Sequence, residues 1–471
     1  MNPHLLVIIL YASLLAVLGI VISRHARGSS EFFVAGRRLS PRLLFATLLA
    51  ANIGGGSTVG AAGLGYRDGL SAWWWVGSAG LGQLLLACTV GPRIWRLATS
   101  GGFYTVGDFL EQRYDRRVRG VIAALVWLGS LFILAGQIIG ISWILTLVTG
   151  LSKPAGCLLG GLCVTIYFTA GGLLSAVWVN TVQLAVKLTG FAVALPMTLL
   201  AVGGWEGIAS HAVHRHAEGY LSLTGAGTGG VAAYLVLLIP PFIVSPGLLQ
   251  KIYGARDEST VRRATAANGL VMLVFSLAPV ILGMAAASAF PALSHQEMAL
   301  PAVLMHVLPV WAGSLALAAI FSAEVSAADA VLFMLTTSFS KDLYKGFLRP
   351  AAQDEQLLRV SRGTSLLAGV LGVTLAILLP SVISALTVFY GLITVSLFVP
   401  VVAGLYLRYP SARTALASIV LSVALTAALH MATGGAGIWG FTPVSIGLLF
   451  SAATLLGDGL RRRSRSPAVA P

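Results

Sequence analysis

The chain contains little charge for its length. Asp, Glu, Lys and Arg make up 10% of its 471 residues, whereas a soluble domain carries roughly 25%. Apolar residues make up 57%, which is more than one globular core can bury, because such cores stop growing at roughly 250–300 residues. This composition excludes a soluble globular protein. It predicts an all-α polytopic membrane protein with the lipid bilayer as its surroundings.

Acidic residues are especially rare, and the formal net charge is +14. Nucleic-acid-binding proteins also carry such an excess, but they gather Lys and Arg on a solvated face with few long apolar runs. Here the basic residues form short clusters between apolar segments, so we expect no nucleic-acid partner. Cysteine is scarce too, and Cys88, Cys157 and Cys163 show no metal or disulfide spacing. We interpret them as packing residues.

Apolar stretches of about 20 residues predict the membrane spans. The first follows a start without a basic region or a small-residue cleavage site, so we expect a retained helix and not a signal peptide. Thirteen spans are predicted, at about 4–23, 43–65, 72–95, 119–148, 155–174, 178–203, 229–250, 268–290, 311–338, 363–380, 383–407, 413–432 and 441–457.

The distribution of Lys and Arg predicts the topology. With thirteen spans and the N-terminus outside, 26 of the 30 basic residues fall in inner segments, and Lys251 is counted in one of these loops. Cytoplasmic loops of membrane proteins carry this excess. We therefore expect a multi-pass protein of the cell (inner) membrane with its N-terminus outside and its C-terminus cytoplasmic.

Two predicted spans contain residues that disturb a helix near mid-membrane. The second contains the run Gly54–Gly56, and each glycine weakens a helix by roughly 1 kcal/mol relative to alanine. The seventh contains Pro240, Pro241 and Pro246, and each proline removes a backbone donor. Unwound backbone at this depth persists only where it is buried in protein or lines a cavity.

These two spans are five apart, which indicates two inverted five-helix repeats with broken first helices. In such an arrangement, substrate and ions bind between the breaks. Close packing of glycine and a simple proline kink remain the alternatives for either helix taken alone. The predicted divisions are an N-terminal extra helix with the start of a loop (1–30), a transporter core (31–410, with repeat one at about 42–203 and repeat two at about 229–407), and two additional helices with a basic tail (411–471).

Several segments in order along the chain resemble the sodium:solute symporter family. They are EFFVAGRRL at 31–39, YFTAGGL at 167–173 followed by AVW at 176–178, LQK and GARD within 249–257, SAAD at 326–329 and KDLYK at 341–345. The similarity covers roughly residues 30–410. It implies the leucine-transporter architecture, with thirteen helices and alternating access for a small solute.

The resemblance also implies where a sodium ion would bind. The family uses backbone carbonyls at the break in the second helix and small or hydroxyl residues on helix nine. In this sequence the corresponding positions are Ala50, Ile53, Ala323, Ser326 and Ala327. Ala327 departs from the family, which usually has Ser or Thr there, and alanine supplies no side-chain oxygen.

Four further polar residues are candidates for ion coupling. Asn180 stands where many relatives have aspartate, and Lys187, Glu324 and Asp329 lie well inside predicted spans. A charge at a helix centre costs at least about 2.5–3.5 kcal/mol, so it is expected to be paired, neutralised or functional. The alternative without a function is that these side chains lie near helix ends and extend to the membrane–water interface. Our hypothesis is that Lys187 replaces the sodium ion, with Glu324 or Asp329 as its counter-charge.

Polar and aromatic residues near the predicted breaks are candidates for solute binding. Each polar residue alone also fits an interhelical hydrogen bond. No Lys or Arg besides Lys187 is expected near the solute, which favours neutral or hydroxyl-rich compounds. The substrate-binding candidates are Asn52, Ser57, Thr58, Trp75, Gln83, Gln137, Phe242 and Ser245.

The sequence thus predicts a secondary active transporter that moves a small organic solute, with sodium-coupled symport as the main expectation. The alternatives are a proton-coupled or uncoupled transporter with Lys187 in place of sodium, and a non-transporting membrane sensor. A short basic tail after residue 457 argues against the sensor. No paired aspartates or His/Glu metal motif indicate an enzyme. No cofactor is expected, and Na⁺ is the one metal ion considered.

Overall fold

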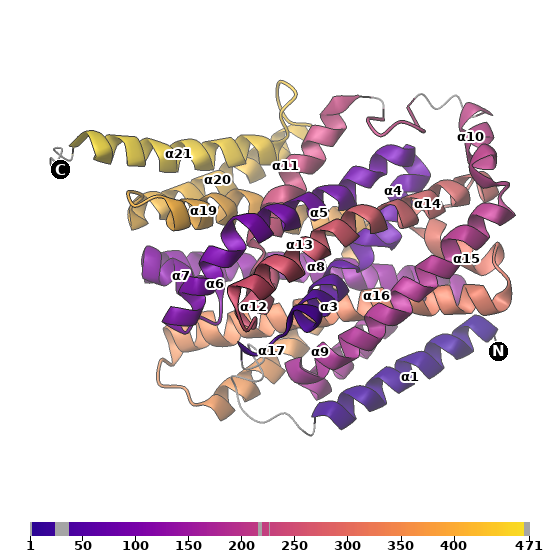
Figure 1. Ribbon diagram of the computed structural model, residues 1–471, viewed down its shortest axis with the longest axis horizontal. Coiled ribbons are helices and arrows are strands. Elements are labelled where there is room, and N and C mark those ends of the chain that lie inside the picture. Colours follow the sequence, from indigo (N-terminus) through magenta and orange to yellow (C-terminus); the bar gives the residue numbers. More distant parts are fainter. Residues whose placement is uncertain (1, 24–36, 215–218, 226, 466–471) are drawn as a thin grey trace.

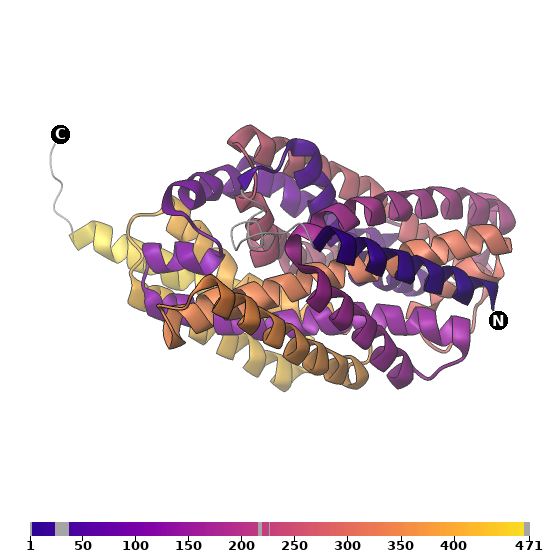
Figure 2. The same ribbon diagram turned by 90° about the horizontal axis from the view of Figure 1, so that it is seen from below.

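The computed structural model describes residues 2–23, 37–214, 219–225 and 227–465, and these residues form helices without a β-strand. Most of the helices run along one long direction of the molecule (Figures 1 and 2). In chain order they are α1 (Pro3–Ser23), α3 (Pro41–Asn52), η2 (Gly55–Ser57), α4 (Val59–Asp68), η3 (Gly69–Ala72), α5 (Trp73–Cys88), α6 (Val90–Gly101), α7 (Val106–Arg113), α8 (Arg116–Thr149), α9 (Lys153–Ala201), α10 (Gly204–His214), α11 (Thr228–Val244), α12 (Pro246–Tyr253), α13 (Glu258–Phe275), α14 (Leu277–Ala289), η4 (Gln296–Met298), α15 (Ala299–His306), α16 (Val310–Thr337), η5 (Ser338–Leu348), α17 (Asp354–Leu378), α18 (Val382–Ile393), η6 (Thr394–Phe398), α19 (Val399–Tyr406), α20 (Ala412–Thr433) and α21 (Pro443–Arg465).

The expectation of a polytopic all-α membrane protein is confirmed. Among the described residues, eight helices are long and apolar enough to cross a membrane, or nine when α3 and the bent segment after it count as one span. Three shorter apolar stretches, Pro3–Leu15, Lys153–Ile166 and Pro443–Gly459, add to these. The exact count of thirteen spans stays a prediction.

The spans expected at 155–174 and 178–203 both lie in the helical element α9. Its two apolar stretches, Lys153–Ile166 and Val179–Ala201, are separate, so the division into two spans stays a prediction. Residues 31–36, the first part of the segment that carries the family resemblance, lie outside the described residues.

Helix α16 forms the centre of the bundle. Its most apolar stretch is 89% buried, whereas the corresponding stretch of α20 is 22% buried. α20 packs mainly against α21. α16 contacts α9 and α8 along its length and also reaches α3. A side chain on α16 can therefore contact both the broken helix and its neighbours.

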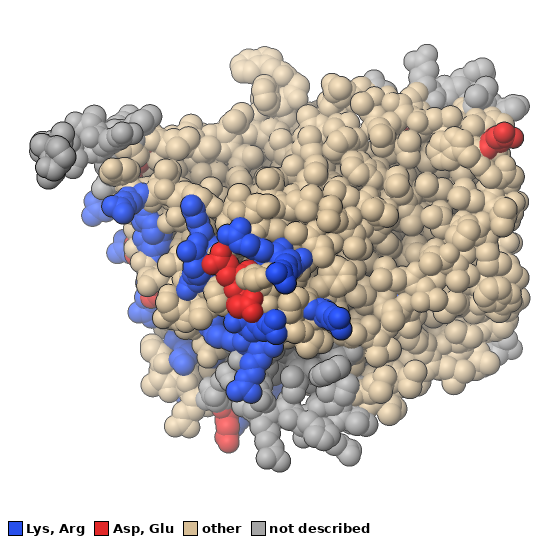
Figure 3. Space-filling view, viewed as in Figure 1, with Lys and Arg blue, Asp and Glu red and all other residues tan. Residues whose placement is uncertain are grey.

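Basic side chains gather at one end of the long axis (Figure 3). We call it the basic end, and its residues include Arg93 and Arg96 of α6, Arg113 of α7 and Arg256. α1 begins at the opposite end (Figure 1). Because basic residues favour the cytoplasmic side, this separation agrees with a membrane normal along the long axis.

A mostly buried arginine joins three elements at the basic end. Arg119 of α8 pairs with Asp108 of α7 at 3.0 Å and with Asp342 of η5 at 2.9 Å, and it also pairs with Glu111. Thr105 donates its hydroxyl to Asp342 at 2.6 Å. This network connects the α7–α8 corner to the end of the central helix.

A buried glutamate closes the packing at the opposite end. Glu297 of η4 accepts hydrogen bonds from the backbone amides of Val382, at 3.0 Å, and Ile383, at 3.3 Å, at the start of α18. It also accepts one from the Trp143 indole at 3.1 Å. Burial raises the pKa of Glu297, although these three donors oppose that shift.

Candidate functional site

The first core helix is broken where the glycine run predicted it. α3 ends at Asn52, a short 3-10 turn follows, and α4 starts at Val59. The segments on either side of the break are bent by 76°. Gly54 is extended, with φ −143° and ψ −164°. The last carbonyls of α3 therefore lack the partners that a continuing helix would supply.

Close packing explains why glycine occupies the break. A Cβ atom on Gly54 would lie 2.4 Å from the Ala327 Cβ, and one on Gly55 would lie 2.5 Å from Glu324 Oε2. The Gly55 amide donates to Gln137 Oε1 at 2.7 Å. Side chains of α8 and α16 thus hold the unwound backbone, as irregular backbone at membrane depth requires.

The second break lies at Ser245, between α11 and α12. Pro240 and Pro241 are accommodated inside α11, and Pro246 occupies the first turn of α12. A proline in that first turn costs no helical hydrogen bond, because those amides have no partner within the helix. The break therefore falls after the paired prolines, at the residue that precedes Pro246, as expected from the restriction that proline puts on its predecessor.

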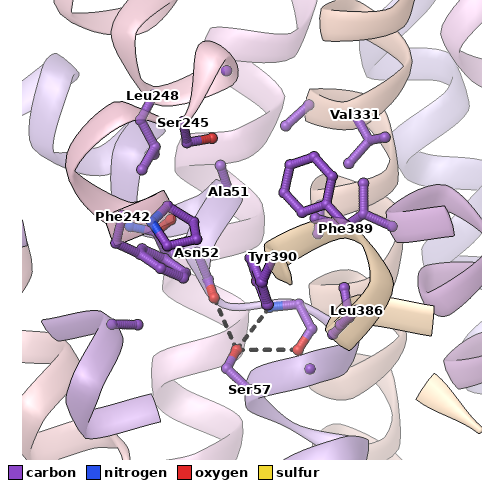
Figure 4. A pocket seen from close by; sticks show the side chains of 18 of the residues that line it. Ala51, Asn52, Ser57, Phe242, Ser245, Leu248, Val331, Leu386, Phe389 and Tyr390 are labelled. Carbon is purple, nitrogen blue, oxygen red and sulfur yellow. Dashed lines mark hydrogen bonds between the residues drawn. The ribbon is translucent and has the colours of Figure 1, made fainter. Parts of the chain in front are cut away.

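A cavity of about 90 Å³ lies between the two breaks (Figure 4). Six of the eight predicted solute-binding residues line it: Asn52, Ser57, Trp75, Gln137, Phe242 and Ser245. Thr58 and Gln83 are buried outside its lining. Thr58 donates to Glu324 at 3.0 Å, and Gln83 donates to the Phe242 carbonyl at 3.2 Å. Both act there as interhelical hydrogen-bonding groups.

Aromatic rings form much of one cavity wall. Trp75 donates its indole N–H to the Gly56 carbonyl at 2.8 Å and meets Tyr390 edge to face, with ring centroids 6.1 Å apart. Phe242 packs on the same tyrosine at 5.5 Å. Rings packed in this way give a firm apolar surface for the body of a solute.

The ammonium group of Lys187 lies at the end of α3. Its Nζ donates to the carbonyl oxygens of Ala50, at 2.8 Å, and Ile53, at 3.0 Å, and to the Ser326 hydroxyl. The side chain is fully buried. The C-terminal carbonyls of a helix carry partial negative charge, so a cation is well placed there. Lys187 thus contacts three of the groups that the family resemblance assigns to a sodium ion.

The residues present do not fit a sodium ion at this position. Sodium needs several oxygen ligands, and the oxygens of Ala50, Ile53 and Ser326 face the Lys187 ammonium. Ala327 adds no side-chain oxygen, and the Ala323 carbonyl lies 3.2 Å from the Ser326 hydroxyl that donates to it. The five predicted ligand positions are brought together around α3 and α16, with a lysine among them.

The two carboxyl groups lie near Lys187 without touching it. Glu324 and Asp329 are buried and interact with its charge, but among the described residues neither forms an ion pair within 4.0 Å. Glu324 Oε2 and both Asp329 carboxyl oxygens lack a hydrogen-bond partner. Asn180 is buried two turns before Lys187 on α9, and its Oδ1 has no partner either.

Sequence reasoning missed several residues of the cavity. Phe389 and Tyr390 of α18 line it, and so does Lys251 of α12. Lys251 is in a helix, not in the predicted loop, so the premise that no further lysine approaches the solute is wrong. The sequence feature that could have revealed Lys251 is its position five residues after Pro246. A helix that restarts at this proline keeps Lys251 within the bundle.

Broken helices that meet at a buried cavity define a secondary transporter. The chain belongs to the sodium:solute symporter family, whose sequence model matches residues 32–422. Membership supports sodium-coupled symport of a small solute as the class of activity.

Known relatives span nearly the whole chain. The sodium/pantothenate symporter of Escherichia coli (strain K12) is 27% identical, covering 95% of this chain and 94% of its own. The sodium/glucose cotransporter of Vibrio parahaemolyticus is 23% identical, covering 89% and 83%. A solved Na⁺-coupled sialic acid symporter matches with a TM-score of 0.80 at 18% identity, covering 98% of both chains. It shows that the fold is shared.

Proposed function

We propose that the protein carries a small organic solute across the membrane by alternating access through the cavity between α3 and α12. The observation that carries this proposal is that both helix breaks open onto one cavity with aromatic walls and a few polar groups. Relatives named for glucose and pantothenate support a small organic solute. The expected inner-membrane location, with the N-terminus outside and the C-terminus cytoplasmic, is part of the proposal and is supported by the basic end.

Counterflow in proteoliposomes tests this function. Vesicles preloaded with one unlabelled solute from a panel should accumulate the same labelled solute. Ala51→Trp, which fills the cavity lining, should abolish accumulation. Leu128→Trp is the matched control, since Leu128 is 51% exposed on the outer surface of α8. Solute binding without counterflow would favour the membrane sensor, and loss of activity in both variants would contradict the assigned route.

A second candidate concerns coupling, namely that the Lys187 ammonium takes the place of a sodium ion at the end of α3. Its contacts with Ala50, Ile53 and Ser326 favour this candidate. A proton that binds to and leaves the Lys187 amine would then change the charge at this position, as a sodium ion does when it binds and dissociates. Glu324 or Asp329, which are both buried near Lys187, would supply the counter-charge.

Uptake under separate ion gradients distinguishes the two forms of coupling. If Lys187 is the coupling cation, a pH gradient should drive uptake of the panel solute without sodium, and Lys187→Ala should remove that drive. Lys345→Ala, which removes a lysine at the basic end, should retain it. Uptake that needs a sodium gradient and is unchanged in Lys187→Ala would leave sodium-coupled symport as the function and exclude the lysine.

A further inference from the structure

Lys251 places a second buried ammonium group at the cavity. It lies in the last turn of α12, lines the cavity and is 8% exposed. Its Nζ donates to the Thr47 hydroxyl at 3.1 Å. Among the described residues, no carboxylate oxygen lies within 4.0 Å of it. A neutral hydroxyl accepts a hydrogen bond from one of the three N–H donors of an ammonium group. It does not neutralise the positive charge.

The contact with Thr47 fixes the depth of this ammonium group. Thr47 lies four residues, one helical turn, before Ala51, which lines the cavity. Ser245 and Leu248 bring the start of α12 to the same cavity. Lys251 lies three residues, about 4.5 Å of helix rise, beyond Leu248, on the side where α12 leads toward the basic end (Figure 1). A polar group of a solute therefore meets this charge at one end of the cavity.

One amide donor of the remaining polar lining is unpaired, because Asn52 Nδ2 has no hydrogen-bond partner. The acceptor oxygen of Gln137 is used by the Gly55 amide. The Ser57 hydroxyl accepts from the Gly54 amide at 3.0 Å and donates to the Asn52 and Gly54 carbonyls. A solute group with several acceptor oxygens could accept hydrogen bonds from the unpaired N–H donors of Asn52 and Lys251.

Asp329 does not occupy the N–H donors of Lys251. Its charge interacts with Lys251 and also with Lys187, but neither of its oxygens has a hydrogen-bond partner. It offsets part of the positive charge at a distance and leaves the N–H donors of Lys251 available. A buried ammonium group with only one neutral partner gains most from a hydrogen-bonded anion.

We propose that the cavity binds a small organic carboxylate, with Lys251 and the Asn52 amide at its anionic group and the aromatic wall of Trp75, Phe242 and Tyr390 against its body. The inference rests on the proposed transport function and names its class of substrate. It replaces the expectation of a neutral or hydroxyl-rich solute.

Matched acids and amides test the proposal on the purified full chain. The probes are lactate and lactamide, benzoate and benzamide, and nicotinate and nicotinamide at millimolar concentration. Binding is measured as the rise in unfolding temperature with concentration, since a ligand of the folded state stabilises it. At least one acid should bind tenfold or more tightly than its amide. Lys251→Gln should lose that preference at least tenfold, and Lys251→Arg should retain it.

Two controls separate a binding effect from a folding effect. Lys345→Gln removes a lysine outside the cavity lining and should leave the preference for acids unchanged. Rescue by arginine shows that charge matters at residue 251, and normal unfolding temperature in the absence of probes shows that the variant folds.

Amides that bind as well as their acids, an unchanged acid preference in Lys251→Gln, or no stabilisation by any acid would each overturn the proposal. Counterflow keeps the two proposals distinct. Transport of uncharged solutes alone would refute the carboxylate and leave the transport function standing, whereas binding of an acid without counterflow would refute transport alone.

Discussion

Replacing Lys187 by alanine should destabilise the protein and create a response to sodium. The change removes a buried donor from the Ala50 and Ile53 carbonyls and from the Ser326 hydroxyl. It also leaves Glu324 and Asp329 without their largest positive neighbour. Leaving a buried acceptor without its donor costs about 1–3 kcal/mol, so we expect the loss of the two carbonyl contacts to lower the free energy of unfolding by about 2–6 kcal/mol.

Sodium should restore part of this loss in Lys187→Ala. The vacated oxygens suit a small cation, and a ligand at a hundred times its Kd stabilises by about 2.7 kcal/mol. Sodium should therefore recover a substantial part of the expected loss. Adding Ala327→Ser to the variant supplies the hydroxyl that this chain lacks, and it should lower the sodium concentration needed.

The assay is thermal unfolding of the purified protein, with NaCl replaced by choline chloride at equal ionic strength. Lys345→Ala should behave as the wild type. Equal stabilisation of the wild type and Lys187→Ala by sodium would refute the reasoning, because the cation position would then bind the ion with the lysine present.

Three further changes test other parts of the structure. Gly55→Ala should lower stability by about 1–3 kcal/mol, because its Cβ would meet Glu324 Oε2 at 2.5 Å; the unfolding temperature checks it, and an unchanged value would mean that the break has room. Arg119→Met should cost about 3–5 kcal/mol by leaving buried Asp342 unpaired; denaturant-induced unfolding checks it, and Asp342→Asn in the same chain should recover part of the loss. The raised pKa of Glu297 means that the folded state binds its proton more tightly than the unfolded state. Its contribution is therefore complete below the ordinary carboxyl pKa of 4.5 and is lost as pH rises through the raised value. The unfolding temperature of the wild type relative to Glu297→Gln should fall across that range, and a rise would contradict the assigned direction.

Residues with strong local effects made the fold and the first break predictable. The glycines at 54–56 and the prolines around Ser245 disturb a helix wherever they occur. Their matching positions predicted two breaks facing one cavity. The depth of Lys187 was predictable as well, because a helix rises by a fixed amount per residue.

Contacts made between distant segments were harder to predict. Lys251 was assigned to a loop because a lysine at the end of an apolar run usually marks the membrane surface. The restart of the helix at Pro246 and the hydroxyl of Thr47 hold it inside the bundle instead. Gln83 was expected at the solute, but the Phe242 carbonyl and the Asn268 amide use its side chain. A sequence pattern does not show which of two buried partners a polar group meets.

Two buried ionisable side chains contact the broken helix on either side of the break. Lys187 binds the carbonyl end of α3, while Glu324 lies against Gly55 and accepts from Thr58 at the amide end of the segment that follows. The Lys187 ammonium has the sign that the carbonyl end of a helix favours. Any motion that separates α3 from α9 must break the bonds of Lys187 to the Ala50 and Ile53 carbonyls. Loss of the ammonium proton removes the charge that strengthens those bonds. If Lys187 is the coupling cation, as proposed above, its protonation state would change the free energy of that motion and take the place of sodium binding. The sodium response of Lys187→Ala tests this proposal, because it measures how well the vacated oxygens bind the ion once the lysine is gone.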